Sequence, residues 1–468
     1  MSKRLWLACI ATLAGMVAAP GARAQDETQR LIECPAGHVL QSITISGRTV
    51  HCVPLPDTGA LQAAINAEAA SRAAADAQLR ELISSGGSGG GTAQVDCGSG
   101  ASIANALASG ATHIIVRGAC TEAVLVARDD VTLEGDATTG GNIHGVDAEV
   151  NTVIVTGHRV TLHRLTVSGG RNGIAGIGAS NLTVRNVTVQ SVGRNGIVYA
   201  SGASGTVDGC TVQSSTRDGI VVDGANARVI NSTVIGNRHG IVYVNGSNGA
   251  VGVTDRAAAG GNTVRDNTGT GILIASGSVA TVTMNQVLQN GTGAGVFQAT
   301  ASIAGGNVIT GNPGGGLVTT ASRVVLGDAA PTGSTVSTFS ANGSPTQTGG
   351  VFAGLGTSMV LRDADISANN GAGLIISLRS QVQMSGTRIQ NNANDGIRLT
   401  LGAALLPLSP VNTVSGNSGF GVGCTDPESS VVNLVGPNPP IVALSGNVAG
   451  NIASACTQFD ANPMPALF

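Results

Sequence analysis

The sequence predicts an all-β parallel solenoid for most of the chain, on the basis of three observations. Of the 468 residues, 69 are glycine, 2% are aromatic and 11% are charged, while 42% are hydrophobic, so the chain can bury a large core. A glycine followed by a β-branched residue or leucine recurs about every 23 residues. Inside each repeat, apolar residues alternate with polar ones, which is the period of a strand.

One repeat has room for three short strands and three turns. In the repeat that begins at Gly219, Ile220 and Val222 point to the same side of a strand, and two further alternating segments complete the unit. Stacked repeats then bury the apolar side chains that a single repeat cannot bury. Each glycine marks a corner that requires a positive φ or a close contact. The aligned glycines are Gly173, Gly196, Gly219, Gly240, Gly271, Gly295, Gly316, Gly350, Gly373, Gly396 and Gly421.

Residues 1–24 are predicted to be a secretory signal peptide. Lys3 and Arg4 precede an apolar run, and Ala22-Arg23-Ala24 forms a small-residue cleavage site. Removal of this segment makes the formal net charge more negative than −3, which argues against a nucleic-acid partner. No later apolar stretch is long enough for a membrane span. We therefore expect a secreted protein, which leaves extracellular, cell-surface and periplasmic locations open.

Three segments of different composition separate the signal peptide from the repeats. Residues 25–57 are predicted to form a small β module closed by a disulfide. Residues 58–83 are rich in alanine, which favours a helical stalk, and residues 59–83 could join three chains into a homotrimer. Residues 84–92 are a Gly/Ser linker. The solenoid is predicted to occupy residues 93–468.

The cysteines predict three disulfides and one free thiol. Of the 8 cysteines, Cys9 lies in the signal peptide, and the odd number that remains leaves one unpaired in an exported protein. Cys210 aligns with an inward position, which predicts a buried, inert thiol. No C-x-x-C spacing of a zinc site occurs. The other six cysteines form couples close in sequence, Cys34–Cys52, Cys97–Cys120 and Cys424–Cys456.

The repeats from Thr152 to Asn451 resemble the right-handed parallel β-helix repeats of the pectate-lyase-like superfamily, over about two thirds of the chain. The resemblance implies a right-handed parallel β-helix. It also implies that residues 100–111 form an amphipathic helix over its open end and that residues 114–135 form its first coils. Roughly thirteen coils, about 4.7–4.9 Å apart, would make a rod about 60 Å long.

Stacking the coils places like residues in two columns beside the corner glycines. Adjacent members of a column would lie about 5 Å apart, where two guanidinium groups repel by about 3 kcal/mol at an effective dielectric constant of 20. The arginines therefore either splay into solvent, alternate with carboxylates or bind an anionic ligand with repeating carboxylates. The first column contains Arg171, Arg194, Arg217 and Arg238, and the second contains Asn172, Asn195, Asp218 and His239.

Enzymes of the superfamily suggest an alternative interpretation of the same residues. The polygalacturonase motifs are incomplete here, because Asp129-Asp130 lies in the first coils and His239 stands in Arg-His-Gly. Pectate lyases use an arginine base and calcium bound by aspartates, and an arrangement of that kind would have Arg217, Asp218, Arg238 and His239 as candidate catalytic residues. The candidate calcium ligands are Asp208, Asp218 and Asp223.

The sequence thus predicts an exported β-helix protein that binds acidic polysaccharide outside the cell or at its surface. Two alternatives stay open: a calcium-dependent uronate lyase, and a non-catalytic structural or adhesin-like rod. No cofactor is expected for the binding function, whereas the lyase alternative calls for calcium.

Overall fold

The computed structural model divides the chain into two units, residues 1–88 and 89–468. In the first unit, β1 (His38–Thr44) and β2 (Thr49–Pro54) pair antiparallel. The predicted signal peptide, Cys34, the stalk and residues 84–89 of the linker lie outside the described residues. The structure describes residues 38–44, 49–54, 90–253, 261–327, 336–345, 348–432 and 441–459.

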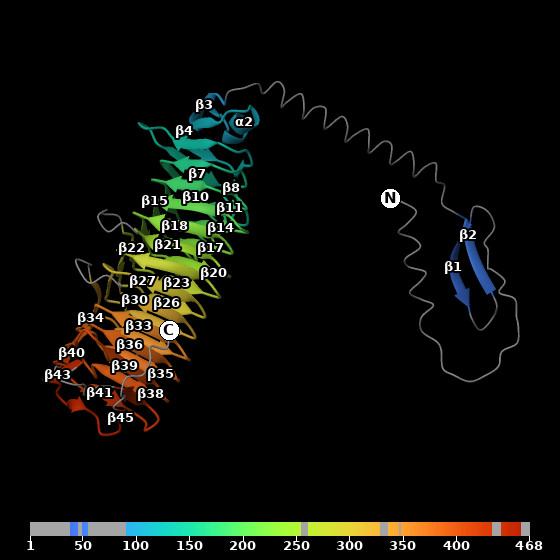
Figure 1. The fold of residues 1–468 in the computed structure, drawn as a ribbon. Helices are drawn as coiled ribbons and strands as arrows, with labels where there is room; N and C mark the ends of the chain where they lie inside the picture. The colour runs from blue at the N-terminus through green and yellow to red at the C-terminus, as the bar shows by residue number, and fades with distance from the viewer. Residues whose placement is uncertain are drawn as a thin grey trace, which may run out of the picture. The chain divides into compact units, whose positions relative to one another are not determined.

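The second unit is a stack of three-sided coils (Figure 1). Strands of successive coils pair in parallel and in register, so that each face of the stack is a parallel sheet. Face 1 carries the strands that follow the corner glycines and contains 14 strands, close to the predicted number of coils. These strands are β5 (Val124–Val126), β8 (Val153–Val155), β11 (Ile174–Ile177), β14 (Ile197–Ala200), β17 (Ile220–Asp223), β20 (Ile241–Val244), β23 (Thr270–Ala275), β26 (Thr292–Phe297), β29 (Leu317–Thr320), β32 (Val351–Gly354), β35 (Leu374–Ser377), β38 (Ile397–Thr400), β41 (Phe420–Cys424) and β44 (Gly450–Ile452).

Faces 2 and 3 join into one 29-stranded sheet because β4 (His113–Thr121) runs through both. Face 2 also contains β3 (Thr92–Asp96), β6 (Thr132–Gly135), β9 (Thr161–His163), β12 (Leu182–Arg185), β15 (Ser204–Asp208), β18 (Asn226–Ile230), β21 (Asn248–Gly252), β24 (Val279–Thr283), β27 (Thr300–Ile303), β30 (Arg323–Leu326), β33 (Ser358–Arg362), β36 (Gln381–Ser385), β39 (Ala404–Leu408), β42 (Ser430–Val432) and β45 (Thr457–Phe459). Face 3 also contains β7 (Gly141–Gly145), β10 (Leu165–Gly169), β13 (Thr188–Gln190), β16 (Thr211–Gln213), β19 (Thr233–Ile235), β22 (Thr263–Arg265), β25 (Gln286–Leu288), β28 (Val308–Thr310), β31 (Ser337–Ser340), β34 (Ala364–Ser367), β37 (Arg388–Gln390), β40 (Asn412–Ser415) and β43 (Val442–Ser445).

The core consists of files of inward side chains, one from each coil. Ile197, Ile220 and Ile241 pair in register and are fully buried, which confirms the inward file predicted from alternation. Full burial of such side chains stabilises the fold by roughly 1.5–3 kcal/mol each. Tyr199 and Tyr243 also point inward, and their hydroxyls donate to buried backbone carbonyls at 3.0 and 2.8 Å.

The corner glycines are required by close contact and not by a positive φ. A Cβ at Gly196 would lie 2.3 Å from Val212 Cγ1 and 2.6 Å from the Gly219 carbonyl oxygen. Neither Gly196 nor Gly219 has a positive φ. The glycines therefore leave room for a valine side chain of the following coil beside the backbone of the next glycine.

One predicted corner position was wrong. In β26, Gly293 holds the corner place, because its carbonyl faces Gly271, while Gly295 pairs with the outward Leu273. A shift of two residues keeps the same side chains on the inner face, so alternation alone does not separate the two registers.

A buried ladder of asparagines, which the sequence analysis did not anticipate, runs inside the corner between faces 3 and 1. The Nδ2 of every member except the last, Asn447, donates to the Oδ1 of the next coil at 2.8–3.2 Å, and each of these Oδ1 atoms also accepts a backbone N–H. Such pairing satisfies polar groups that would otherwise be costly to bury. The members are Asn237, Asn267, Asn290, Asn312, Asn342, Asn369, Asn392, Asn417 and Asn447.

The first coils are covered by α2 (Ile103–Ala108), which lies within the predicted helix of residues 100–111. Its apolar side is buried, and Glu122 accepts the backbone N–H groups of Ile103 and Ala104 at 2.9 and 3.2 Å. In the part of the chain that the structure describes, no helix is long and apolar enough to cross a membrane.

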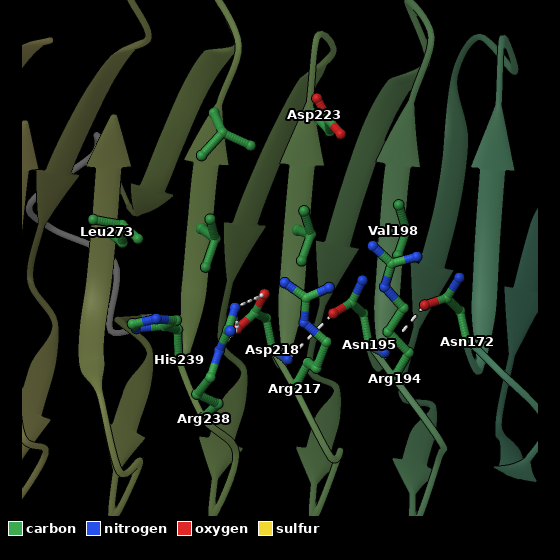
Figure 2. Close-up of a pocket in the computed structure, with 13 residues that line it drawn as sticks. Asn172, Arg194, Asn195, Val198, Arg217, Asp218, Asp223, Arg238, His239 and Leu273 are labelled. Atoms are coloured by element: carbon green, nitrogen blue, oxygen red, sulfur yellow. Dashed lines mark hydrogen bonds and ion pairs between the residues drawn. The ribbon is translucent and has the colours of Figure 1, made fainter. Parts of the chain in front are cut away.

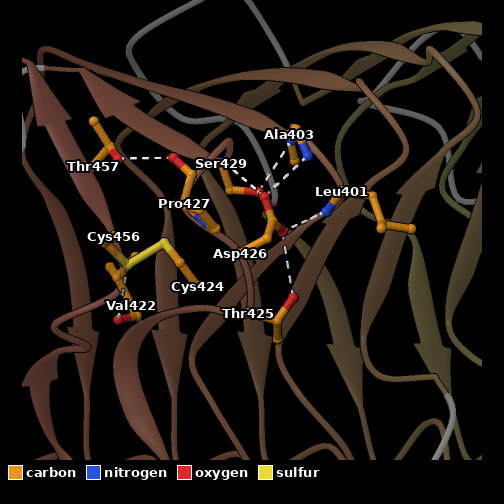
Figure 3. The surroundings of a disulfide bond; sticks show 11 residues. Leu401, Ala403, Val422, Cys424, Thr425, Asp426, Pro427, Ser429, Cys456 and Thr457 are labelled. Carbon is orange, nitrogen blue, oxygen red and sulfur yellow. Dashed lines mark hydrogen bonds between the residues drawn. A yellow bond between two sulfur atoms is a disulfide. The ribbon is translucent and has the colours of Figure 1, made fainter.

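Disulfides fasten both ends of the solenoid, and two of the predicted pairings are present. Cys97 bonds to Cys120, and Cys424 bonds to Cys456 in the last coils (Figure 3). Beside the second bond, Asp426 accepts the backbone N–H groups of two neighbouring turns. Cys210 is free and buried, as predicted, and its burial raises the pKa of the thiol to about 11, which is consistent with an unreactive thiol.

Replacement of Asn290 by alanine is expected to destabilise the fold by at least about 2 kcal/mol. It leaves the backbone N–H and the Nδ2–H of Asn267 buried without their shared acceptor. Chemical unfolding measures the effect, with Asn226→Ala, an exposed asparagine of β18, as the control. Equal unfolding midpoints for the two variants would contradict a structural role for the ladder.

Gly196→Ala is expected to lower the thermal unfolding temperature by several degrees, because the new methyl group would collide with Val212 and with backbone. Gly91→Ala is the control, since a Cβ there would meet no atom within 4 Å. A Gly196→Ala protein as stable as the control would show that the corner relaxes without cost.

Candidate functional site

A pocket opens on the outside of face 1, across β14, β17, β20 and β23 (Figure 2). Its volume is about 350 Å³, within the range of small-ligand sites. The floor is apolar, because Val198, Val221, Val242 and Leu273 turn their side chains outward from the sheet. We call this the arginine pocket, after Arg194, Arg217 and Arg238, which line it.

The second predicted column forms the base of the arginine pocket at the point where each coil enters face 1. Asn172, Asn195, Asp218 and His239 all line the pocket. The backbone N–H of Asn195 donates to Asn172 Oδ1 at 3.1 Å, and that of Asp218 donates to Asn195 Oδ1 at 3.2 Å. These amides therefore hold the coils in register as well as lining the pocket.

Arg238 and Asp218 form a two-pronged ion pair. The Nε and Nη2 atoms of Arg238 donate to the two carboxylate oxygens of Asp218 at 3.1 and 3.0 Å. The Asp218 side chain is only 9% exposed, and Arg238 supplies the hydrogen bonds that its carboxylate oxygens would otherwise take from water. Both carboxylate oxygens of Asp218 are thus occupied by Arg238.

Arg194 and Arg217 have no such partner. Within the described residues, neither guanidinium group forms an ion pair, and the Nε of Arg194 is buried without a hydrogen-bond partner. Their backbones are hydrogen-bonded at 2.8 Å, which places the two residues in adjacent coils. Figure 2 shows both side chains extending along the strands over face 1, Arg194 toward Val198. The arginine pocket therefore contains two neighbouring guanidinium groups that form no direct ion pair with a carboxylate of the described residues, although Asp223 lines its far end.

The contacts of His239 leave its Nε2 as the nitrogen that can donate a hydrogen bond. Its Nδ1 accepts the backbone N–H of Thr270 at 2.8 Å. Burial lowers the pKa of the ring below the usual 6.5, an effect that the Asp218 charge opposes and the Arg238 charge reinforces. In the neutral ring, the proton is then on Nε2, which can donate to a ligand.

The structure does not bring all of the remaining candidates together. Arg171 is exposed and does not line the arginine pocket. Asp223 lines the pocket at the far end of β17, where it accepts a hydrogen bond from Asn245 at 2.7 Å. Asp208 ends β15 on face 2 and accepts from Asn231 at 2.7 Å. Of the three candidate calcium ligands, Asp208 therefore lies on a different face from the other two.

Elsewhere in the described part of the chain, one group of three side chains could offer metal ligands, namely Cys97, Cys120 and Glu122. The two sulfur atoms are bonded to each other, and Glu122 accepts hydrogen bonds at the start of α2. This group is therefore accounted for by its structural contacts.

The sequence analysis missed the apolar floor. It expected polar side chains on the outside of each strand, whereas Val198, Val221 and Val242 directly follow the inward isoleucines. The sequence does contain a signal for this floor, namely two consecutive apolar residues after the corner glycine. Because successive residues of a strand point to opposite faces, such a pair makes both faces of the strand apolar.

Several solved structures are similar to this chain in fold. The A-module of a mannuronan C-5 epimerase from Azotobacter vinelandii has a TM-score of 0.42 and 15% identity, and the match covers 80% of this chain and 92% of the module. The catalytic unit of an α-1,3-glucanase from Streptomyces thermodiastaticus has a TM-score of 0.41 and 14% identity, with 80% and 71% covered. Tailspike protein 3 of bacteriophage CBA120 has a TM-score of 0.35 and 14% identity, with 75% and 57% covered.

A search of curated protein sequences found no match. The sequence model of the right-handed β-helix region, by contrast, matches residues 98–255, 172–336 and 327–434. Together with the three-sided parallel coils, this match confirms the resemblance indicated by the repeats: the chain belongs to the right-handed β-helix family.

Proposed function

We propose that this chain is an exported protein that binds an acidic polysaccharide, with the carboxylates of the glycan held by Arg194 and Arg217. The observation that carries the proposal is the pair of neighbouring guanidinium groups in the arginine pocket that form no ion pair within the described residues. The two disulfides support the export part of the proposal, because such bonds persist mainly outside the reducing cytosol.

The electrostatics of the arginine pocket favour an anion. Two unit charges about 5 Å apart repel by about 3 kcal/mol at an effective dielectric constant of 20. A carboxylate between the two guanidinium groups offsets this repulsion through charge-assisted hydrogen bonds to their exposed N–H groups. The valine floor beside them suits the apolar side of a sugar ring, so that one ring can make both kinds of contact.

The same contacts favour binding over the lyase alternative. A base must have a free lone pair facing the proton that it removes. The Nδ1 of His239 is occupied by a backbone N–H, and both carboxylate oxygens of Asp218 are hydrogen-bonded to Arg238, so neither group is directed toward a substrate proton. Guanidinium groups stay charged in proteins, which suits Arg217 to anion binding. A purely structural rod would leave the unpartnered Nε of Arg194 without an explanation.

Combined replacement of Arg194 and Arg217 by alanine is expected to lower the affinity for polygalacturonate at least tenfold, because each charge-assisted hydrogen bond contributes roughly 1.5–3 kcal/mol. Isothermal titration calorimetry at two salt concentrations measures the loss. Arg228→Ala, an exposed arginine of β18 on face 2, is the matched control and should bind as the unmodified protein does.

Unchanged affinity in the double variant would contradict the proposal. Formation of unsaturated uronate, seen as rising ultraviolet absorbance after calcium is added to the protein and polygalacturonate, would instead support the lyase alternative.

Replacement of His239 by glutamine is expected to reduce the acid sensitivity of the fold. Because the pKa of folded His239 lies below 6.5, the unfolded chain binds more protons around this pH, and stability falls as the pH is lowered through that value. Glutamine does not titrate but can still accept from Thr270. Thermal unfolding between about pH 7.5 and pH 5.5 should therefore show a smaller loss in His239→Gln, and an equal loss would contradict the assignment.

A further inference from the structure

Beyond the arginine pocket, face 1 continues as an uncharged surface. Strands β23, β26, β29, β32 and β35 contain no charged residue. Leu273, which lines the arginine pocket, pairs in register with Gly295, then Val318, then Phe352. The apolar floor of the pocket therefore extends without interruption along the coils, and at about 4.8 Å per coil Phe352 lies about 24 Å from the coil of Arg217.

Two aromatic rings lie on this surface. A Cβ at Gly295 would be 2.7 Å from Cε2 of Phe297, and a Cβ at Gly354 would be 2.5 Å from Cε1 of Phe352. Each ring thus packs against the glycine of its own strand. Both phenylalanines are partly exposed. Packing of an aromatic ring over a glycine accounts for the buried side of each ring, and it leaves the exposed side without a protein partner.

From this surface we propose that the bound polysaccharide contains uncharged sugar residues next to its uronates, and that the uncharged residues stack on Phe297 and Phe352. This inference rests on the proposed function of the arginine pocket. The occupant is a continuation of the same glycan chain, because the surface is continuous with the floor that holds the acidic residue.

The absence of charge on these five strands decides between classes of acidic glycan. A polymer of uronates alone would place carboxylates over an apolar surface, where they lose water and gain no cationic partner. Uncharged rings place their apolar sides on the two phenylalanines, and their hydroxyls can reach Thr320, which stands in register between Phe297 and Gly354. The favoured ligand is therefore a mixed glycan, acidic over the arginines and neutral over the phenylalanines.

The test compares short and long oligosaccharides of two kinds. Hyaluronan tetrasaccharide and dodecasaccharide alternate acidic and neutral residues, and oligogalacturonates of the same lengths are acidic throughout. In the unmodified protein, lengthening the hyaluronan probe is expected to raise the affinity about tenfold, with a smaller gain for oligogalacturonate. Combined Phe297→Leu and Phe352→Leu keeps the glycines covered but removes the ring faces, and should abolish the hyaluronan gain without weakening the tetrasaccharide.

Phe420→Leu is the matched control, because Phe420 is a partly exposed phenylalanine in β41 beyond this surface. Retention of the length-dependent gain in the Phe297/Phe352 variant overturns this inference, and so does an equal gain for oligogalacturonate. Self-association of the unmodified protein that is lost in the Phe297/Phe352 variant also overturns the inference. That result would assign the surface to a second copy of the chain.

The two proposals fail separately. Loss of tetrasaccharide binding in the Arg194/Arg217 variant supports the arginine pocket whatever the phenylalanine variant does. If the Arg194/Arg217 variant instead binds the tetrasaccharide with full affinity, the arginine pocket is not the acidic site. The mixed glycan inferred from it is then rejected as well.

Discussion

In-register stacking of parallel coils is the constraint on which the rest of this structure depends. Each residue lies directly against its equivalent in the next coil, about 4.8 Å away. The side chain at each position must therefore be compatible with the equivalent side chain of the neighbouring coil. Isoleucine against isoleucine gives the core files, and asparagine against asparagine gives the buried ladder. Stacking arginine on arginine in the same way is unfavourable, because like charges repel. A column of arginines is therefore stable only where something intervenes.

The repulsion between neighbouring arginines is handled differently at different coils of the arginine column. Arg238 is neutralised by Asp218 from the preceding coil, where the buried carboxylate accepts both prongs of the guanidinium group. Arg194 and Arg217 have asparagines near them in place of a carboxylate, and these amides are used for coil-to-coil bonds. The difference between Asn195 and Asp218 thus separates the arginine that is paired with a carboxylate, Arg238, from the two that are not, Arg194 and Arg217.

Most of the fold could be predicted from the sequence, because alternation and period are both local properties of the chain. The common inward side of Ile220 and Val222 and the disulfide Cys97–Cys120 were predicted correctly. The corner at Gly293 was missed, since a shift of two residues leaves the inner face unchanged. The asparagine ladder was missed because asparagine is also a good turn residue, and only the corner geometry decides whether its amide points inward.

The candidate site was less accessible to sequence reasoning. The spacing of the arginines predicted that Arg194, Arg217 and Arg238 line one surface, but not which of them Asp218 would neutralise. Asp208 was grouped with Asp218 and Asp223 on proximity in sequence, whereas it stands at the end of a strand on another face. In a coil of about 23 residues, ten residues along the chain lead around a corner, so closeness in sequence is a poor guide to closeness on the outer surface.

The asparagine ladder is compatible with coils of different length. Asn237 and Asn267 are 30 residues apart, whereas Asn267 and Asn290 are 23 apart, yet the same hydrogen bond from Nδ2 to Oδ1 joins both pairs. Extra residues can therefore leave the wall of the solenoid between two ladder positions without disturbing the helix beneath them. In evolutionary terms, the rod can acquire, lose or exchange surface loops one coil at a time while its interior stays the same.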